Sequence, residues 1–416
     1  MKPERVFQVL LFLGLLAGGW LYGDYWKKNV PENRGKEGLA ELRARNGELT
    51  AEIDQLTDEL AQVRSMLASG PYPVPDTLIA WVEREHDMVF LKAPDVRLAS
   101  PIDLREAANR NLEFVHGQDG LEHEGLVWEL LGILPPNQRL KIQFLFVNSS
   151  GVKGLFDLTQ ERILLAENFD PVSVPDRSVL VRLLGQQLSF QNHPKKSWTA
   201  RDQWQAWEAV HVGAAAALQS RFLRRNAAAN QAGWENPEPQ REELLNDLAP
   251  ALAGLCNFPF IEGADYTRFF YLDSRSAFTE MFRNPPETTR EVLHPKLVPE
   301  KTALPLPKPD LAGETIFRSN LGELGLRLWL DPYLGNQESA ELASAWRDDQ
   351  YFLQKADRSH LLVWQVRLES RESAQKLASA LQKEIIPALR ELQPIREQTV
   401  TVESDLVTLT NAPKSE

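Results

Sequence analysis

The first pattern along the chain is an apolar segment near its start. Residues 6–23 read VFQVLLFLGLLAGGWLYG, and Gln8 is the one strongly polar position among them. As a helix, this segment extends about 27 Å, which is close to the thickness of the hydrocarbon core of a bilayer. Aromatic rings that favour the membrane–water interface cluster at its end: Trp20, Tyr22, Tyr25 and Trp26. We therefore predict a membrane anchor over residues 1–28, with residues 6–23 in the lipid bilayer.

A cleaved signal peptide is the alternative interpretation of this segment. Lys2 and Arg5 precede the apolar core, as in a signal peptide, but no convincing small-x-small cleavage site is present. The orientation is harder to predict, because Lys27 and Lys28 add positive charge on the other side. An N-terminal segment that resembles a signal anchor favours a short tail inside the cell and a large domain outside the cytoplasm.

A narrow apolar stripe with spacings of three and four follows over residues 37–68. Its positions are Leu39, Leu42, Asn46, Leu49, Ile53, Leu56, Leu60, Val63 and Leu67. This is the heptad pattern of a coiled coil, in which a buried Asn at an a position favours a parallel dimer in register. We predict a coiled-coil stalk that pairs two copies of the chain. A helix that folds back against the large domain is the alternative, because an apolar stripe serves that purpose equally well.

The pattern changes at residues 69–76, SGPYPVPD, whose prolines cannot continue a helix. We interpret this segment as a proline-rich linker. Beyond it, patterns typical of helices and of short strands alternate irregularly. They predict a helix-rich α+β domain over residues 77–402, followed by a C-terminal strand and tail over residues 403–416. A second proline-rich stretch, residues 304–309, indicates an extended surface crossing or a flexible link.

Individual elements of the main domain are predicted from the spacing of apolar residues. Helices are expected over Leu126–Ile133, over most of Arg177–Leu255, and over Thr315–Leu330, Ser339–Trp346 and Ser373–Leu392. Strands are expected over Leu140–Val147, Arg162–Glu167, Leu362–Leu368, Thr399–Val402 and Leu406–Leu409.

Composition narrows the classes of function. The 416 residues are 43% hydrophobic, enough for a sizeable core, and carry a formal net charge of −12. An acidic chain without a general basic field is a poor partner for nucleic acid. The single cysteine, Cys256, excludes an internal disulfide and a thiolate metal cluster, and its apolar neighbours predict a buried, inert thiol. Nucleophile elbows, phosphate-binding glycine loops and dinucleotide fingerprints are absent as well.

Several segments carry a resemblance to a known family. In chain order they are Leu130–Pro136, Gly154–Asp157, Asn284–Pro295, Asn320–Arg327 and Ala345–Tyr351. Together they resemble a family of bacterial proteins with a gluzincin-type zinc-peptidase signature, and the matches span roughly residues 80–370. The most specific match is NPPETTREVLHP, residues 284–295, which is similar to the family pattern PP-x-S/T-T-E-x-x-L-H-P. The resemblance implies a zincin-like fold for the main domain and leaves the anchor and stalk outside it.

The family's zinc-binding positions hold other residue types in this chain. Its H-E-x-x-H helix binds the metal through two neutral imidazoles, and the glutamate polarises the bound water. The resemblance places Arg182 and Gln186 at the histidine positions and Leu183 at the glutamate. Arginine offers only donors, leucine has no base, and a glutamine carbonyl is a weak ligand. Val212 stands where the family has its third ligand, a glutamate, so we expect no catalytic zinc and no cofactor.

A remodelled metal site on neighbouring helices is the alternative. Glu208 and His211 lie three residues apart, and His193 ends the preceding helix, so these side chains are its candidate ligands. A helical Glu-x-x-His pair without a second such motif usually reflects a solvated helix face. His294, beside a proline, is a candidate residue of the former cleft, although capping or packing also accounts for it.

Three functions fit these observations. The first is a membrane-anchored, catalytically inactive homologue of zinc peptidases that binds or scaffolds an unidentified protein or peptide in the bacterial cell envelope, as a parallel homodimer on the cytoplasmic membrane. The second is a hydrolase with the remodelled metal site, and the third is a spacer in an envelope assembly. An apolar groove around Leu183 and Val212 favours the first function, convergent carboxylates and imidazoles favour the second, and a packed interior favours the third.

Overall fold

The structure, a computed structural model, describes mainly the chain beyond residue 70. The described residues are 45, 47, 71–194, 197–226, 238–296, 306–307, 309, 313–356 and 359–414. The chain divides into two units, Met1–Ser69 and Gly70–Glu416. The predicted anchor and every predicted seam position of the stalk lie outside the described residues and stay predictions. No helix within these described ranges is long and apolar enough to cross a membrane.

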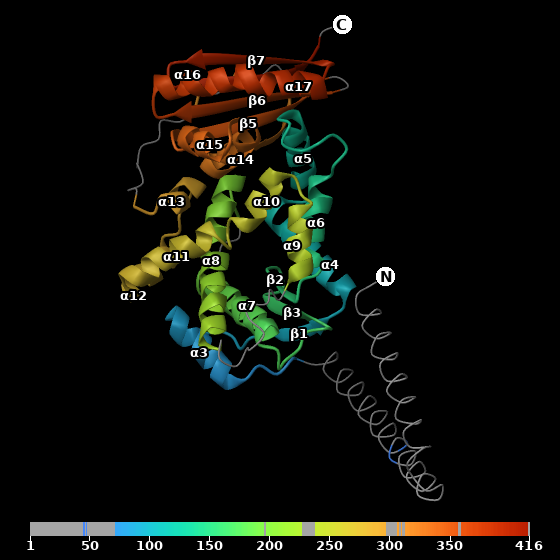
Figure 1. Cartoon of the computed structure of the whole chain (residues 1–416), viewed down its shortest axis with the longest axis vertical. Helices are drawn as coiled ribbons and strands as arrows, with labels where there is room; N and C mark the ends of the chain where they lie inside the picture. Colours follow the sequence, from blue (N-terminus) through green and yellow to red (C-terminus); the bar gives the residue numbers. More distant parts are fainter. Residues whose placement is uncertain are drawn as a thin grey trace, which may run out of the picture. The chain divides into compact units, whose positions relative to one another are not determined.

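The second unit is α+β, with many helices and two small sheets (Figure 1), which confirms the predicted helix-rich α+β class. Its helices are α3 Asp76–His86, α4 Pro101–His116, α5 Gly120–Leu130, α6 Leu140–Ser149, α7 Val174–Asn192, α8 Arg201–Arg225, α9 Pro239–Asn246, α10 Pro250–Asn257, α11 Glu262–Asp273, α12 Arg275–Arg283, α13 Thr289–Leu293, α14 Gly322–Leu334, α15 Asn336–Ala343, α16 Arg371–Ala380 and α17 Ile386–Leu392. Its strands are β1 Val96–Ala99, β2 Gly154–Asp157, β3 Arg162–Ala166, β4 Thr315–Ser319, β5 Trp346–Ala356, β6 Ser359–Leu368, β7 Arg396–Glu403 and β8 Leu406–Pro413.

Two long helices, α7 and α8, pack together in the helical part (Figure 1). α7 starts after Ser173, whose side chain accepts a hydrogen bond from the backbone N–H of Asp176 and so caps the helix. Nearly every face of α7 is buried, which is typical of a helix in the core of a large domain. The two helices approach closely where Gly185 of α7 faces Ala215 of α8.

The smaller sheet lies against α4 and α7 and contains three strands in the order β1-β3-β2. β1 runs parallel to β3, whereas β2 runs antiparallel to it. All four residues of β2 are buried, so this strand forms part of the interior and not of the surface. The predicted strand over Arg162–Glu167 is confirmed as β3.

The larger sheet contains five antiparallel strands in the order β4-β5-β6-β8-β7. β8 lies between β6 and β7, so the last described residues complete this sheet. The predicted helix over Ser373–Leu392 is observed as α16 and α17, which are joined by the π-helical segment Leu381–Ile385. Pro387 follows this segment, and proline removes a backbone donor that a regular helix needs.

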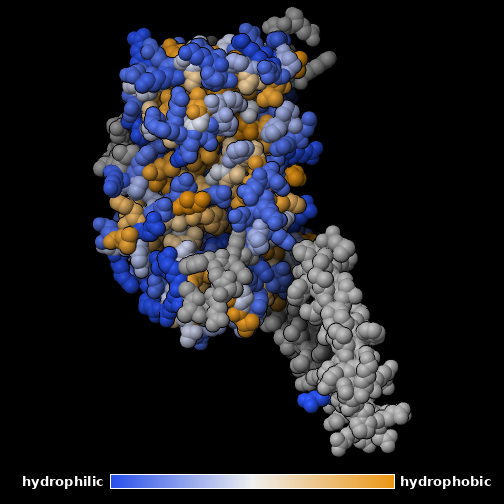
Figure 2. Space-filling model, in the orientation of Figure 1, coloured by the Kyte–Doolittle hydropathy of each residue, from blue (hydrophilic) through white to orange (hydrophobic). Residues whose placement is uncertain are grey.

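One hydrophobic core extends through the helical part and both sheets. Trp128 of α5 and Trp364 of β6 are among its largest fully buried side chains. Exposed large hydrophobic residues, such as Val172 and Leu272, are scattered over separate elements. On the face shown in Figure 2, hydrophobic residues gather between more numerous hydrophilic ones.

The predicted strand over Leu140–Val147 is wrong, because this segment forms helix α6. Alternation of apolar residues suggested a strand with Leu140, Ile142, Phe144 and Phe146 on one face. The structure buries Leu140 and Phe144, which are four residues apart, and exposes Ile142 and Phe146 by about half. That is the helical period, and the buried face packs against α4.

The predicted helix over Thr315–Leu330 is wrong in its first third. Thr315–Ser319 forms β4, which pairs with β5, and the helix begins only at Gly322. Gly322 has a φ of 71°, a left-handed conformation that separates the strand from the helix. The predicted helix over Ser339–Trp346 is similarly shifted, because α15 ends at Ala343 and Trp346 opens β5.

Candidate functional site

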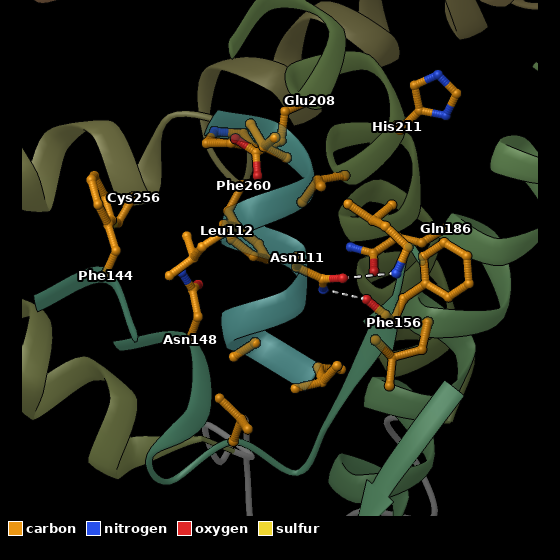
Figure 3. A pocket seen from close by; sticks show the side chains of 18 of the residues that line it. Asn111, Leu112, Phe144, Asn148, Phe156, Gln186, Glu208, His211, Cys256 and Phe260 are labelled. Atoms are coloured by element: carbon orange, nitrogen blue, oxygen red, sulfur yellow. Dashed lines mark hydrogen bonds between the residues drawn. The ribbon is translucent and has the colours of Figure 1, made fainter. Parts of the chain in front are cut away.

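A cavity of about 210 Å³ lies among α4, α6, α7, α8 and β2 (Figure 3). Residues from α9, α10 and the turn that contains Phe260 complete its wall. The structure brings together at this cavity the four positions singled out by the resemblance: Arg182, Leu183, Gln186 and Val212. Glu208, from the alternative metal site, lines the same cavity.

Helical spacing explains why these residues meet. Arg182, Leu183 and Gln186 lie within little more than one turn of α7. Glu208 and Val212 lie four residues apart on α8, so they share one face of that helix. Because α7 and α8 pack against each other, the two faces border one space.

The side chain of Arg182 is held by an acid. Its Nη2 donates a hydrogen bond to Glu238 Oε2 at 3.0 Å, and the Arg182 side chain is only 8% exposed. Glu238 Oε1 accepts a second hydrogen bond, from the backbone N–H of Lys153 at 2.9 Å. A guanidinium keeps its proton and has no lone pair, while Leu183 and Val212 present only hydrocarbon. The residues at the aligned positions therefore do not fit a zinc ion.

Two further guanidinium groups line the cavity. Arg201 Nη1 donates to Glu124 Oε2 at 2.8 Å, and both side chains are buried. The guanidinium of Arg241 lies 4.8 Å from the centroid of the Phe260 ring, and that of Arg182 lies 5.5 Å from the same centroid. Guanidinium groups stack favourably on aromatic rings, so Phe260 holds two cations at the cavity wall.

Glu208 extends from α8 into the cavity (Figure 3). Burial raises the pKa of its carboxyl to about 7, and the positive charges of Arg201 and Arg241 oppose this rise. No hydrogen bond links its carboxyl to another described residue. A carboxyl group that is partly protonated near neutral pH can accept or donate a hydrogen bond, so Glu208 is the titrating group of the cavity.

The two histidines of the alternative metal site have different surroundings. The His211 ring points away from Glu208 (Figure 3), and its Nδ1 lies 2.9 Å from Ser189 Oγ. His193 stacks on Phe282 with ring centroids 5.7 Å apart. Burial lowers the pKa of both imidazoles, that of His211 to about 3. Over the described ranges, no group of three or more His, Cys, Asp or Glu could hold a metal ion.

His294 lies outside the cavity, in a second polar cluster. Its Nε2 is 2.6 Å from Glu323 Oε1, and Arg290 Nη1 donates to Glu323 Oε2 at 2.8 Å. Glu323 is almost completely buried, and these contacts connect α13 with α14. His294 therefore pairs with an acid at a helix junction and does not form part of the cavity wall.

Two buried carboxyl groups extend this second cluster between the helices and the larger sheet. Asp202, at the start of α8, accepts a hydrogen bond from the backbone N–H of Thr289 at 3.1 Å. Asp349, on β5, accepts four hydrogen bonds, from the backbone N–H groups of Leu321 and Gly322 and from the indole N–H groups of Trp346 and Trp364. This polar network joins α8, α13, α14 and β5. It contains three of the segments that carry the resemblance: residues 284–295, 320–327 and 345–351.

Some residues of the cavity could not be singled out in the sequence. Arg241 and Phe260 lie far from α7 along the chain and belong to no motif, and only folding places them at the same wall. Cys256 also lines the cavity and is partly buried, and burial raises the pKa of its thiol to about 11. A thiol with so high a pKa is a poor nucleophile at neutral pH, in line with the inert thiol expected from the sequence.

Comparisons of this chain with family models, with curated protein sequences and with solved structures found no match.

Proposed function

We propose that this chain is a membrane-anchored, catalytically inactive homologue of bacterial zinc peptidases that binds or scaffolds a protein or peptide partner in the cell envelope. One observation supports this proposal above the others. The four positions aligned with the family's three metal ligands and its catalytic glutamate line a single cavity, and their side chains are a cation, two aliphatic groups and an amide. Such a cavity can hold a ligand but cannot generate a metal-bound hydroxide.

The walls of the cavity suit binding. Hydrocarbon and aromatic side chains form most of the lining, with a small number of charged and amide groups among them, which is the usual composition of a ligand pocket. The ion pair between Arg182 and Glu238 occupies the position of one expected metal ligand, so a metal ion could not be coordinated there. Under this proposal the main domain keeps a zincin-like scaffold, the stalk sets a dimeric state, and residues 6–23 hold the protein at the membrane.

The hydrolase with a remodelled metal site finds no support in the geometry. Glu208 extends into the cavity, the ring of His211 points away from Glu208, and His193 packs on Phe282. The spacer function is compatible with the polar network around Asp349, but it leaves the cavity and its charged lining without a role.

The proposal can be tested by metal analysis of the full-length protein purified in detergent. We expect no stoichiometric zinc by elemental analysis and no hydrolysis of unstructured peptides. One tightly bound metal per wild-type chain, or peptide hydrolysis that a chelator abolishes, would defeat the proposal.

A restored variant provides the matched comparison. Arg182→His, Leu183→Glu, Gln186→His and Val212→Glu together recreate the family's ligand set and its catalytic glutamate. If the alignment is correct, this variant retains about one zinc ion per chain. A variant that keeps the wild-type circular dichroism spectrum and still binds no zinc would contradict the relationship to zinc peptidases.

A further inference from the structure

Two of the three guanidinium groups that line the cavity form ion pairs with acids, whereas the third stacks on an aromatic ring. Arg182 is paired with Glu238 at 3.0 Å, and Arg201 is paired with Glu124 at 2.8 Å. Arg241 contacts the face of Phe260 and lies within the influence of the negative charge of Glu238, but its guanidinium donates no hydrogen bond to any residue that the structure describes. A guanidinium has five N–H donors in a fixed fork, so Arg241 keeps its donors available for a ligand.

Two side-chain amides also offer hydrogen-bond donors and acceptors to a ligand in the cavity. Asn148 of α6 and Gln186 of α7 both line the cavity (Figure 3), and neither side chain is hydrogen-bonded within the described ranges. Asn111 differs from them, because its side chain is already bonded to the backbone of Phe156 and Leu158. The cavity therefore offers a guanidinium and two amides beside an apolar wall.

We propose that this cavity binds a ligand with one carboxylate and a small apolar body, with the carboxylate held by Arg241, with the amides of Gln186 and Asn148 available to other polar atoms of the ligand, and with Glu208 protonated. This inference rests on the proposed binding function and specifies the chemistry that the site recognises. The apolar body contacts Leu183, Val212 and the aromatic side chains of the wall.

The balance of charge favours an anion over a cation. Three guanidinium groups line the cavity, and their acids Glu238 and Glu124 compensate two of them. The negative charge of Glu238 acts on both Arg182 and Arg241, so the three guanidinium groups and the two acids leave one positive charge, which Glu208 balances only when it is ionised. A ligand carboxylate can take over this role if Glu208 carries a proton, whereas a ligand ammonium would lie close to Arg241.

The volume limits the size of the ligand. A cavity of about 210 Å³ corresponds to about seven water molecules at the volume that each occupies in the liquid. A single residue with its terminal carboxylate fits this space, and a folded segment does not. A free carboxylic acid and the C-terminal residue of a polypeptide share this chemistry, and the experiment distinguishes them.

Proton uptake accompanies binding under this proposal. The other titratable and charged groups that line the cavity with Glu208 are Arg182, Arg201, Arg241, Glu238, Cys256, His116 and His211. Burial keeps the pKa of both histidines near 3 and that of the thiol near 11, so none of these three titrates near neutral pH. An incoming carboxylate raises the pKa of Glu208 further, and binding should weaken as the pH rises above about 7.

Calorimetric titration of the full-length protein in detergent tests the proposal. The ligands are N-acetyl-leucine, its amide N-acetyl-leucinamide, and an unstructured peptide ending in leucine with a free or an amidated C-terminus. We expect at least tenfold tighter binding of the carboxylate forms. Binding of both N-acetyl-leucine and the free peptide indicates a polypeptide terminus as the ligand, and binding of N-acetyl-leucine alone indicates a free acid.

Variants assign the interaction to the named residues. Arg241→Gln should weaken carboxylate binding at least tenfold, and Arg241→Lys, which keeps the charge without the planar fork, should weaken it less. Arg275→Gln, at an exposed position on α12, is the control and should bind as the wild type does. Glu208→Gln should remove the weakening of binding between pH 6.5 and 8.

Equal binding of acid and amide, an unaffected Arg241→Gln variant that is folded, or no binding of either carboxylate at millimolar concentration would overturn the inference. Elemental analysis of the same samples separates this failure from failure of the proposed function. If the wild-type protein contains no zinc and binds no carboxylate, only the inference about the ligand is wrong. If it contains stoichiometric zinc, the proposed function is wrong.

Discussion

Asp202, in the second polar cluster, has a strongly raised pKa, and the structure shows the causes. Burial raises its pKa to about 8, hydrogen bonds from Thr289 oppose the rise, and the negative charges of Asp349 and Glu323 add to it. Its Oδ2 is buried without a hydrogen-bond partner among the described residues, so no donor stabilises a negative charge on this oxygen. Gly322 is adjacent, and any side chain there would overlap with the Asp202 carboxyl group.

The titration of Asp202 predicts how stability depends on pH. The pKa is raised in the folded state, so the folded protein holds this proton between about pH 4 and pH 8 while the unfolded chain has released it. The contribution of Asp202 to the free energy of unfolding should therefore fall as pH rises through this window, by at most about 1.4 kcal/mol per pH unit for one proton. The range from pH 7 to 8 is the most informative, because the buried histidines are neutral there in the folded state and mostly neutral in the unfolded chain, and comparison with a variant at Asp202 cancels their remaining contribution.

Asp202→Asn should flatten this dependence. Urea unfolding at pH 7 and at pH 8 should show a smaller loss of stability in the variant than in the wild type. Asp265→Asn, at an exposed position on α11, is the matched control and should keep the wild-type difference. If Asp202→Asn and the wild type lose equal stability between the two pH values, Asp202 is ionised throughout and its assignment as a protonated acid is incorrect.

At the scale of elements, glycines determine how closely α8 and α11 approach. A Cβ at Gly213 would overlap with the backbone carbonyl of Gly263, and a Cβ at Gly263 would collide with the backbone of Ala209. Gly213 lies next to Val212 in the segment aligned with the family's third metal ligand. In this fold Gly213 has a packing role, because it allows α11 to lie directly on α8.

Gly213→Ala should therefore destabilise the protein despite the better helix propensity of alanine. Overpacking of a rigid backbone contact costs typically about 1–3 kcal/mol, which a urea titration resolves. Gly120→Ala, in the first turn of α5, is the comparison, because its Cβ would approach only a His116 side-chain atom, at 3.3 Å. Equal stability of Gly213→Ala and wild type would show that α8 and α11 can separate without cost.

At the scale of the whole molecule, the heptad pattern predicts the oligomeric state. A protein comprising residues 37–416 should be a dimer by light scattering, because the apolar seam and the buried Asn46 favour two parallel strands. Deletion of residues 37–68 should give a monomer. A monomer in both cases would remove the stalk from the proposed function, and a dimer in both would assign the interface to the main domain.

The candidate site shows how far residue types alone can lead. The sequence predicts which chemistry is missing, because Arg182, Leu183 and Val212 lack electron pairs for a metal whatever their surroundings. Spacing alone also predicts that Glu208 and Val212 share one face of a helix. It cannot show that Glu208 and His211 have different surroundings, or that Glu238 pairs with Arg182, because these facts depend on side-chain directions and on a partner far along the chain.

The α+β class and the helices α7, α8, α16 and α17 follow from the sequence itself, because apolar periodicity and proline positions act over a few residues. The structure alone decided that Leu140–Val147 is a helix, since only packing against α4 reveals which apolar residues are buried. It alone decided that Arg241 and Arg182 share the ring of Phe260. Local propensity and long-range contact are separate sources of free energy, and the cavity depends on the second.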